Sequence, residues 1–216
     1  MTLKNSKSVI LSLFALPILS CLIAIQNIPM VVDSDNGLMI SALEQYHSKK
    51  VSQFHTFTGV SPYDLSKDVN VWISWYTPGV SLLFYPAKYL PFSLGDSIRL
   101  LGLSYYLVGL WGWFSIWKYL KGHIISLWMM VFTGFVYYQR IGGLLYLHAD
   151  VLPFSIFPWL LLWGLNLINY CHKCTGISFM DSLQLHTRSI TFGLSCGLVY
   201  WLKYSGFISI AALLTG

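Results

Sequence analysis

The stretch Ser8–Val32, which reads SVILSLFALPILSCLIAIQNIPMVV, contains no charged residue and decides the fold. A helix needs roughly 20 predominantly apolar residues to cross a bilayer. The apolar core of a secretory signal peptide is shorter, about 7–15 residues. We therefore interpret residues 8–30 as an uncleaved first transmembrane helix rather than as a signal peptide.

The composition of the whole chain agrees with this interpretation. Of the 216 residues, 56% are hydrophobic and only 10% are charged, whereas soluble domains contain about 25% charged residues. Further spans are expected at 97–117, 123–139 and 151–170. The predicted fold class is all-α, a polytopic transmembrane helix bundle. The chain ends in an apolar run, so we expect residues 1–216 to form a single transmembrane domain, the N-terminal part of a longer protein.

The segments between the expected spans differ in character. Residues 33–78 are polar and aromatic, which predicts a long outer loop after the first span. The run Gly79–Leu94 is apolar but interrupted by prolines and a lysine. It is too short and broken for a crossing, so it predicts an interfacial helix lying on the membrane. A polar stretch is expected at 172–189, followed by an apolar run at 190–202.

The basic residues indicate an orientation. Cytoplasmic loops are enriched in Lys and Arg, and alternating spans place the following residues on one side: Lys4, Lys7, Lys118, Lys121, Lys173 and Arg188. We expect a multi-pass protein of the cell membrane with a cytoplasmic N-terminus. All acidic residues except Asp181 then lie on the extracytoplasmic side. The net charge is +5 and the basic residues are dispersed along the chain. We therefore expect the bilayer, and not nucleic acid, as a partner.

An acidic pair, Asp33-Ser34-Asp35, directly follows the charge-free stretch. Residues two apart lie on different sides of a helix and on one side of a strand, and in an irregular loop they can converge. A carboxylate here can take a proton from a hydroxyl group as a general base. It can also bind a divalent cation through oxygen. A solvated loop with an Asx-type turn is the alternative.

Three further residues carry charge at or near the expected outer membrane edge. Asp150 precedes the span at 151–170, where it is either a helix N-cap or part of a shared site with the acidic pair. Arg99 opens the span at 97–117, where it either binds phosphate bidentately or anchors the helix at the interface. Lys203 follows an apolar run of roughly 20 Å, shorter than a roughly 30 Å hydrocarbon core. Ionisable residues in such positions suggest function.

Several motifs follow one another in order: Asp33-Ser34-Asp35 with Gly37–Ala42, Trp75–Leu83, Leu94–Leu101 containing Arg99, then Asp150, then Gly197–Gly206 containing Lys203. This ordered set resembles the integral-membrane glycosyltransferases of the GT-C superfamily. It is most similar to the branch of the protein O-mannosyltransferases and the lipid A aminoarabinose transferases. The resemblance covers nearly the whole chain.

The resemblance implies an enzyme that moves a sugar from a polyprenyl-phosphate donor to an acceptor at the outer membrane face. Asp35, with Asp33 in reserve, then acts as the base or holds a divalent cation such as Mg²⁺ or Mn²⁺. Arg99 and Lys203 then stabilise the departing lipid phosphate, where charge grows in the transition state. Asp150 has a supporting role. The acceptor is not identified by these motifs.

Two other classes of protein are alternatives. A transporter subunit could use Asp150 and Lys203 as an intramembrane pair. Transporters of that kind are commonly built from inverted repeats with broken helices, and the sequence contains no internal repeat. A non-catalytic membrane scaffold is the other alternative.

Overall fold

The computed structural model describes residues 3–28, 34–48, 56–61, 63–72, 78–121, 124–140, 151–173 and 179–202. Within them the chain is mostly helical, as the sequence predicts. The helices are α1 (Leu3–Asn27), α2 (Ser34–His47), α3 (Pro78–Phe84), the 3₁₀-helix η1 (Tyr85–Tyr89), α4 (Leu94–Tyr119), α5 (Ile124–Arg140), α6 (Val151–Lys173) and α7 (Phe179–Leu202). Two strands, β1 (Thr56–Val60) and β2 (Asp68–Trp72), complete the described elements.

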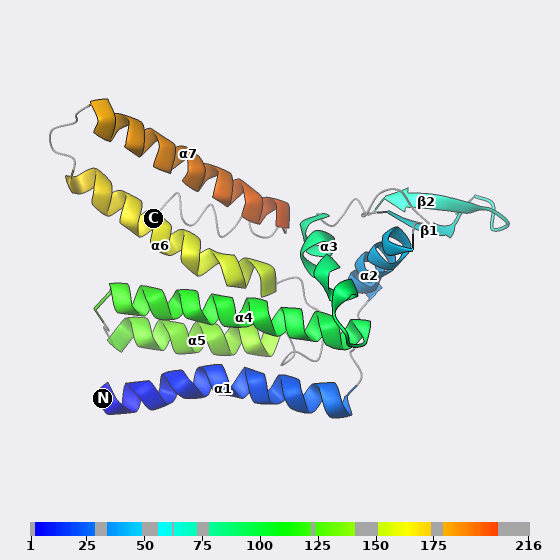
Figure 1. Cartoon of the computed structure of the whole chain (residues 1–216), viewed down its shortest axis with the longest axis horizontal. Helices are drawn as coiled ribbons and strands as arrows, with labels where there is room; N and C mark the ends of the chain where they lie inside the picture. Colours follow the sequence, from blue (N-terminus) through cyan, green and yellow to red (C-terminus); the bar gives the residue numbers. More distant parts are fainter. Residues whose placement is uncertain are drawn as a thin grey trace.

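The long helices α1, α4, α5, α6 and α7 form a bundle in which the chain runs back and forth (Figure 1). At one end α1 and α5 end, α4 and α6 begin, and α2, α3 and the two strands lie beyond them. We call this the hairpin end. At the other end α1 begins and α4 gives way to α5 through a turn that contains Lys121. We call this the lysine end.

Three of the described helices are long and apolar enough to cross a membrane: Ile10–Asn27 of α1, Leu94–Tyr119 and Val151–His172. They match the first, second and fourth spans expected from the sequence, with ends that differ by a few residues. The third expected span corresponds to α5, which has 17 residues. At 1.5 Å per residue, α5 covers roughly 25 Å, slightly less than the hydrocarbon core.

The centre of the bundle is the contact between α4 and α6, where small residues let the two helices approach closely. A Cβ atom on Gly109 would lie 2.6 Å from the Phe154 ring and 2.8 Å from the Phe154 carbonyl oxygen. A Cβ on Gly112 would lie 2.7 Å from the ring of Pro158. Small residues at such interfaces are how membrane helices gain packing contact.

Aromatic side chains and hydrogen bonds complete this packing. The Tyr106 ring stacks on Phe154 with centroids 5.1 Å apart. Its hydroxyl donates a 2.8 Å hydrogen bond to the Gly134 carbonyl of α5. The indole of Trp159 donates to the Val108 carbonyl at 3.1 Å. In this way α4 is fixed to both α5 and α6.

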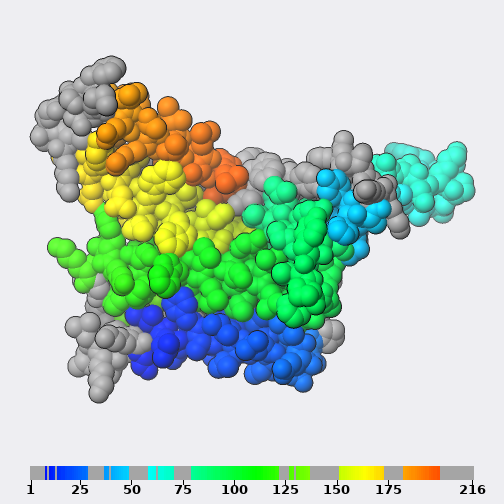
Figure 2. Space-filling model, viewed as in Figure 1, coloured from blue at the N-terminus to red at the C-terminus, as the bar shows by residue number. Residues whose placement is uncertain are grey.

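The β-hairpin is the part of the fold that the all-α prediction misses. β1 pairs antiparallel with β2, with Thr58 opposite Asn70, and the hairpin projects away from the bundle (Figure 2). In its turn, hydrogen bonds from Lys67 and then Ser66 hold the pKa of the Asp64 carboxyl below its ordinary value. The hairpin is attached to α2, because the Thr58 amide donates to the Gln45 side chain at 2.5 Å.

Two other expectations are corrected. The single helix expected over Gly79–Leu94 is divided into α3 and η1, and α4 then begins at Leu94. Pro86 near the start of η1 explains the break, because it has no N–H for a helical hydrogen bond. The polar stretch at 172–189 is also not a loop throughout, because residues 179–189 form the first half of the continuous helix α7.

The glycine contacts of α4 lead to a prediction about stability. Gly109→Ala should lower the free energy of unfolding by about 1–3 kcal/mol, because the added methyl group meets the Phe154 backbone as well as its ring. The matched control is Gly197→Ala in α7, where no described atom lies within 4 Å of the new Cβ. It should be neutral or stabilise by up to about 1 kcal/mol. Thermal unfolding in detergent measures both, and equal effects would contradict this packing.

Candidate functional site

Arg99 is the predicted site residue whose side chain and contacts the structure describes in most detail. Its side chain is completely buried, and its Nη1 lies 3.4 Å from the Asp96 carboxylate. Its Nη2 donates a 3.1 Å hydrogen bond to the Ile28 carbonyl, just past the end of α1. A cation at the C-terminal end of a helix also interacts favourably with the helix dipole. Arg99 therefore fastens the end of α1 to the start of α4.

The residues that precede Arg99 prepare this contact. Ser93 is the N-cap of α4, and its hydroxyl accepts a 3.2 Å hydrogen bond from the Asp96 amide. The same hydroxyl donates to the Asp96 carboxylate at 2.6 Å. Asp96 is thereby fixed in the first turn, where a negative charge is favourable. A continuous polar chain links Ser93 to Asp96, Arg99 and Ile28.

The acidic pair lies at the same end of the bundle, as far as it is described. Asp35 is the second residue of α2, a helix that begins at Ser34. Asp33 lies outside the described residues. For Asp35 the structure describes the backbone but not the side chain. What is placed is the start of α2, at the hairpin end near the end of α1 (Figure 1).

Asp150 and Lys203 also lie outside the described residues. Their sequence neighbours are placed, because α6 begins at Val151 and α7 ends at Leu202. Both of these helix ends lie at the hairpin end of the bundle (Figure 1). Helix α7 also contacts the short helix α3. The helix ends that adjoin the predicted site residues thus gather at one end, while the relative positions of the side chains stay a prediction.

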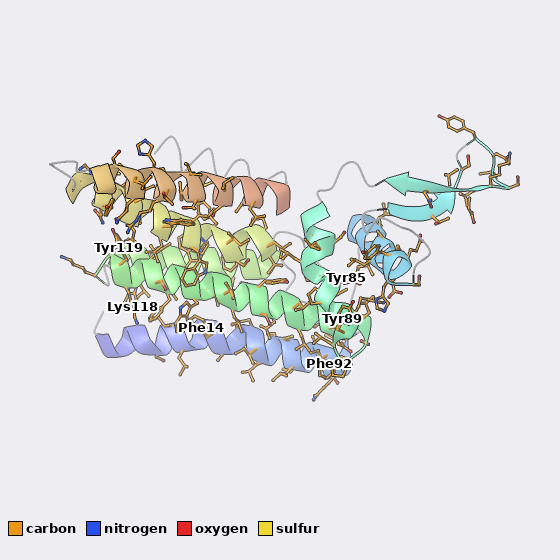
Figure 3. The ribbon with its side chains drawn as sticks, turned by 45° about the horizontal axis from the view of Figure 1, so that its top comes forward. Phe14, Tyr85, Tyr89, Phe92, Lys118 and Tyr119 are labelled. Carbon is orange, nitrogen blue, oxygen red and sulfur yellow. The ribbon has the colours of Figure 1, made fainter. Side chains whose placement is uncertain are left out.

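A polar and aromatic cluster between α2 and η1 was not singled out by the sequence. Lys88 of η1 pairs with Glu44 of α2 at 2.5 Å, although its side chain is only 13% exposed. Beside the ion pair, the Tyr89 hydroxyl donates to the Tyr85 hydroxyl at 3.0 Å. The His47 ring meets the Tyr89 ring edge-on, with centroids 5.9 Å apart. Figure 3 shows Tyr85 and Tyr89 at the hairpin end, next to α2.

The signal for this cluster is weak in the sequence. Tyr85 and Tyr89 are four positions apart in the sequence, and tyrosines beside an apolar segment are typical of the aromatic belt at a membrane interface. Lys88 and Glu44 are 44 positions apart in the sequence. A local sequence pattern therefore does not predict their ion pair. It fixes α2, the helix that carries Asp35, against η1.

A divalent cation at the acidic pair is not supported by further ligands in the described part of the chain. No group of three or more His, Cys, Asp and Glu side chains that could hold a metal ion occurs among those residues. The pair alone offers carboxylate oxygens, which suit Mg²⁺ or Mn²⁺. Metal binding by Asp33 and Asp35 therefore remains a prediction.

Comparisons with protein-family models, with curated proteins and with solved structures found no match to this chain. The class of protein therefore rests on the residues and on the fold.

The position of Arg99 predicts a structural role that can be measured. Arg99→Leu should lower the free energy of unfolding by roughly 1.5–3 kcal/mol, because Asp96 and the Ile28 carbonyl each lose a charge-assisted hydrogen bond. Lys67→Gln removes an ion pair of similar spacing in the exposed hairpin turn, where the Lys67 side chain is 74% exposed. It should leave the unfolding temperature in detergent unchanged. Equal shifts in the two variants would argue against the structural role of Arg99.

Proposed function

We propose that this chain is a membrane-embedded glycosyltransferase of the GT-C type. It transfers a sugar from a polyprenyl-phosphate donor to a nucleophilic acceptor at the extracytoplasmic face. The observation that carries the proposal is the gathering, at the hairpin end, of the start of α2 with Asp35, the buried Arg99, and the helix ends next to Asp150 and Lys203.

In this reaction the acceptor oxygen attacks the anomeric carbon of the sugar and displaces the lipid phosphate. The C–O bond to the phosphate breaks, and the leaving phosphate keeps the electron pair. The Asp35 carboxylate, or Asp33 in reserve, takes the proton of the acceptor hydroxyl. Positive charge from Lys203 and Arg99 favours the growing negative charge on the phosphate. Asp150 supports the arrangement, and no step requires a metal ion.

The contacts of Arg99 give it a second task in the same proposal. By binding the Ile28 carbonyl, Arg99 sets where α1 ends, and the chain continues from there into Asp33 and Asp35. The Glu44–Lys88 ion pair and the Gln45–Thr58 hydrogen bond hold α2 from its other side. Catalytic groups need such rigid support to stay within reach of the reacting atoms.

The orientation in the membrane follows from the charges at the two ends. The exposed Lys118 and Lys121 lie at the lysine end, which the positive-inside rule assigns to the cytoplasm. Among the residues with described side chains, the acids Glu44, Asp64, Asp68 and Asp96 belong to the hairpin end. The proposed site is then extracytoplasmic, where lipid-linked sugars present their head groups in the mechanism that the resemblance implies.

Sugar transfer by the membrane-inserted protein tests the proposal. Asp35→Asn should reduce transfer from a radiolabelled polyprenyl-phosphate sugar by about 10²–10⁴-fold, the range for loss of a general base, while membrane insertion is kept. Asp33→Asn should show whether the reserve carboxylate contributes. Asp68→Asn, in the exposed hairpin, is the matched control and should retain activity. Unchanged transfer in both Asp33→Asn and Asp35→Asn would exclude this mechanism and favour a scaffold or a transporter subunit.

The orientation has a separate test. In a background with all four cysteines replaced by serine, Tyr63→Cys places a thiol at the hairpin turn, where Tyr63 is 98% exposed. Lys121→Cys places one at the exposed turn of the lysine end. A membrane-impermeant maleimide added to intact cells should label only the first, and permeabilised cells should label both. The reverse pattern would place the proposed site in the cytoplasm.

A further inference from the structure

An apolar groove lies between α1 and α4 toward the lysine end, far from the proposed transfer site. Its volume is about 480 Å³, within the range of about 300–1,000 Å³ that is common for small-molecule sites. Its walls are formed by these residues: Ile10, Leu11, Phe14, Trp111, Phe114 and Trp117, with Lys118 beside them. Figure 3 shows Phe14 and Lys118 in the space between the two helices.

The groove opens to the outside of the bundle. Leu11 is 71% exposed and Trp111 is 56% exposed. Both helices contain candidate membrane spans, which include Ile10–Asn27 and Leu94–Tyr119. The groove therefore faces lipid when these spans lie in a bilayer, and an acyl chain can enter it sideways.

Lys118 gives the groove one charged end. Its ammonium group lies 4.7 Å from the centroid of the Phe114 ring, a wall of the groove, and this cation–π contact holds the charge at the groove. In the described part of the chain no carboxylate pairs with Lys118, whereas the described lysines at the hairpin end do pair with acids. Lys121 follows in the adjacent turn and is exposed. Among the described side chains that line it, the groove thus combines apolar walls with one positive charge, that of Lys118.

We infer that this groove binds an anionic glycerophospholipid, with an acyl chain along the apolar walls and its phosphate group at Lys118. A free phosphate ion does not use the apolar walls, and a neutral lipid does not use the charge. Basic pockets between transmembrane helices on the cytoplasmic side are known to take anionic head groups. This inference concerns the opposite end of α4 from Arg99 and does not depend on sugar transfer.

Tryptophan fluorescence of the full chain in phosphatidylcholine nanodiscs tests the inference, because Trp111 and Trp117 line the groove. Phosphatidylglycerol with brominated acyl chains should quench more than brominated phosphatidylcholine at the same mole fraction. The expected preference is roughly fivefold in binding, the factor that corresponds to about 1 kcal/mol for one lysine near an anionic lipid. Lys118→Gln should abolish the preference.

Two controls locate the effect. Lys121→Gln removes the same charge three positions away, outside the groove walls, and should keep the preference. The double variant Trp111→Phe, Trp117→Phe should lose the extra quenching even if Lys118→Gln proves too unstable to measure. Equal quenching by both brominated lipids, or equal losses in Lys118→Gln and Lys121→Gln, would overturn the inference. The inference would also be overturned if polyprenyl phosphate displaced the brominated phosphatidylglycerol more strongly than unlabelled phosphatidylglycerol does.

Discussion

The close contact of α4 with α6 is the interaction on which the rest of the structure depends. Lipid chains are as apolar as leucine, so helices in a bilayer gain little from hydrophobic burial and associate through packing and hydrogen bonds. Gly109 and Gly112 let the Phe154 backbone and the Pro158 ring approach α4 at distances that a Cβ would forbid. Because α4 also contacts α1, α5 and η1, its position fixes the frame to which the other elements attach.

At the hairpin end, the first turns of α4 also hold the end of α1 in place. Ser93 caps α4 and orients Asp96, and Asp96 pairs with the buried Arg99. A buried guanidinium is costly unless it is paired and hydrogen-bonded, and the Ile28 carbonyl supplies a further described partner. This requirement ties the end of α1 to one point on α4. In the sequence, the segment that contains the acidic pair follows this anchored helix end.

Much of the helical frame could be predicted because it depends on local composition. Charge-free runs show where α1, α4 and α6 lie, and lysines mark where α4 ends. The hairpin was missed because each strand has five residues, too few for a clear pattern in an aromatic segment. The alternation of β-branched residues in Thr56–Val60, with turn-forming Pro62 and Asp64 after it, is the signal that was available. In α7 the polar composition of residues 179–189 hid a helix that contains neither proline nor glycine in that half.

The site could be predicted only in outline, for a physical reason. A charged residue at a membrane edge is visible in the sequence, but its partner is chosen by tertiary structure. Arg99 was expected to bind phosphate or to reach the interface. Phosphate binding stays a prediction, and the described contacts of Arg99 include the Ile28 carbonyl, just past the end of α1, and the first-turn carboxylate of its own helix. Lys88 likewise pairs with Glu44 across 44 positions of sequence. These contacts anchor helices at the hairpin end, while Lys118 at the other end of α4 rests on an aromatic ring beside an apolar groove. The two cations of α4 thus have different surroundings: Arg99 is buried and joins helices at the hairpin end, whereas Lys118 supplies the charge beside the groove for which we infer lipid binding.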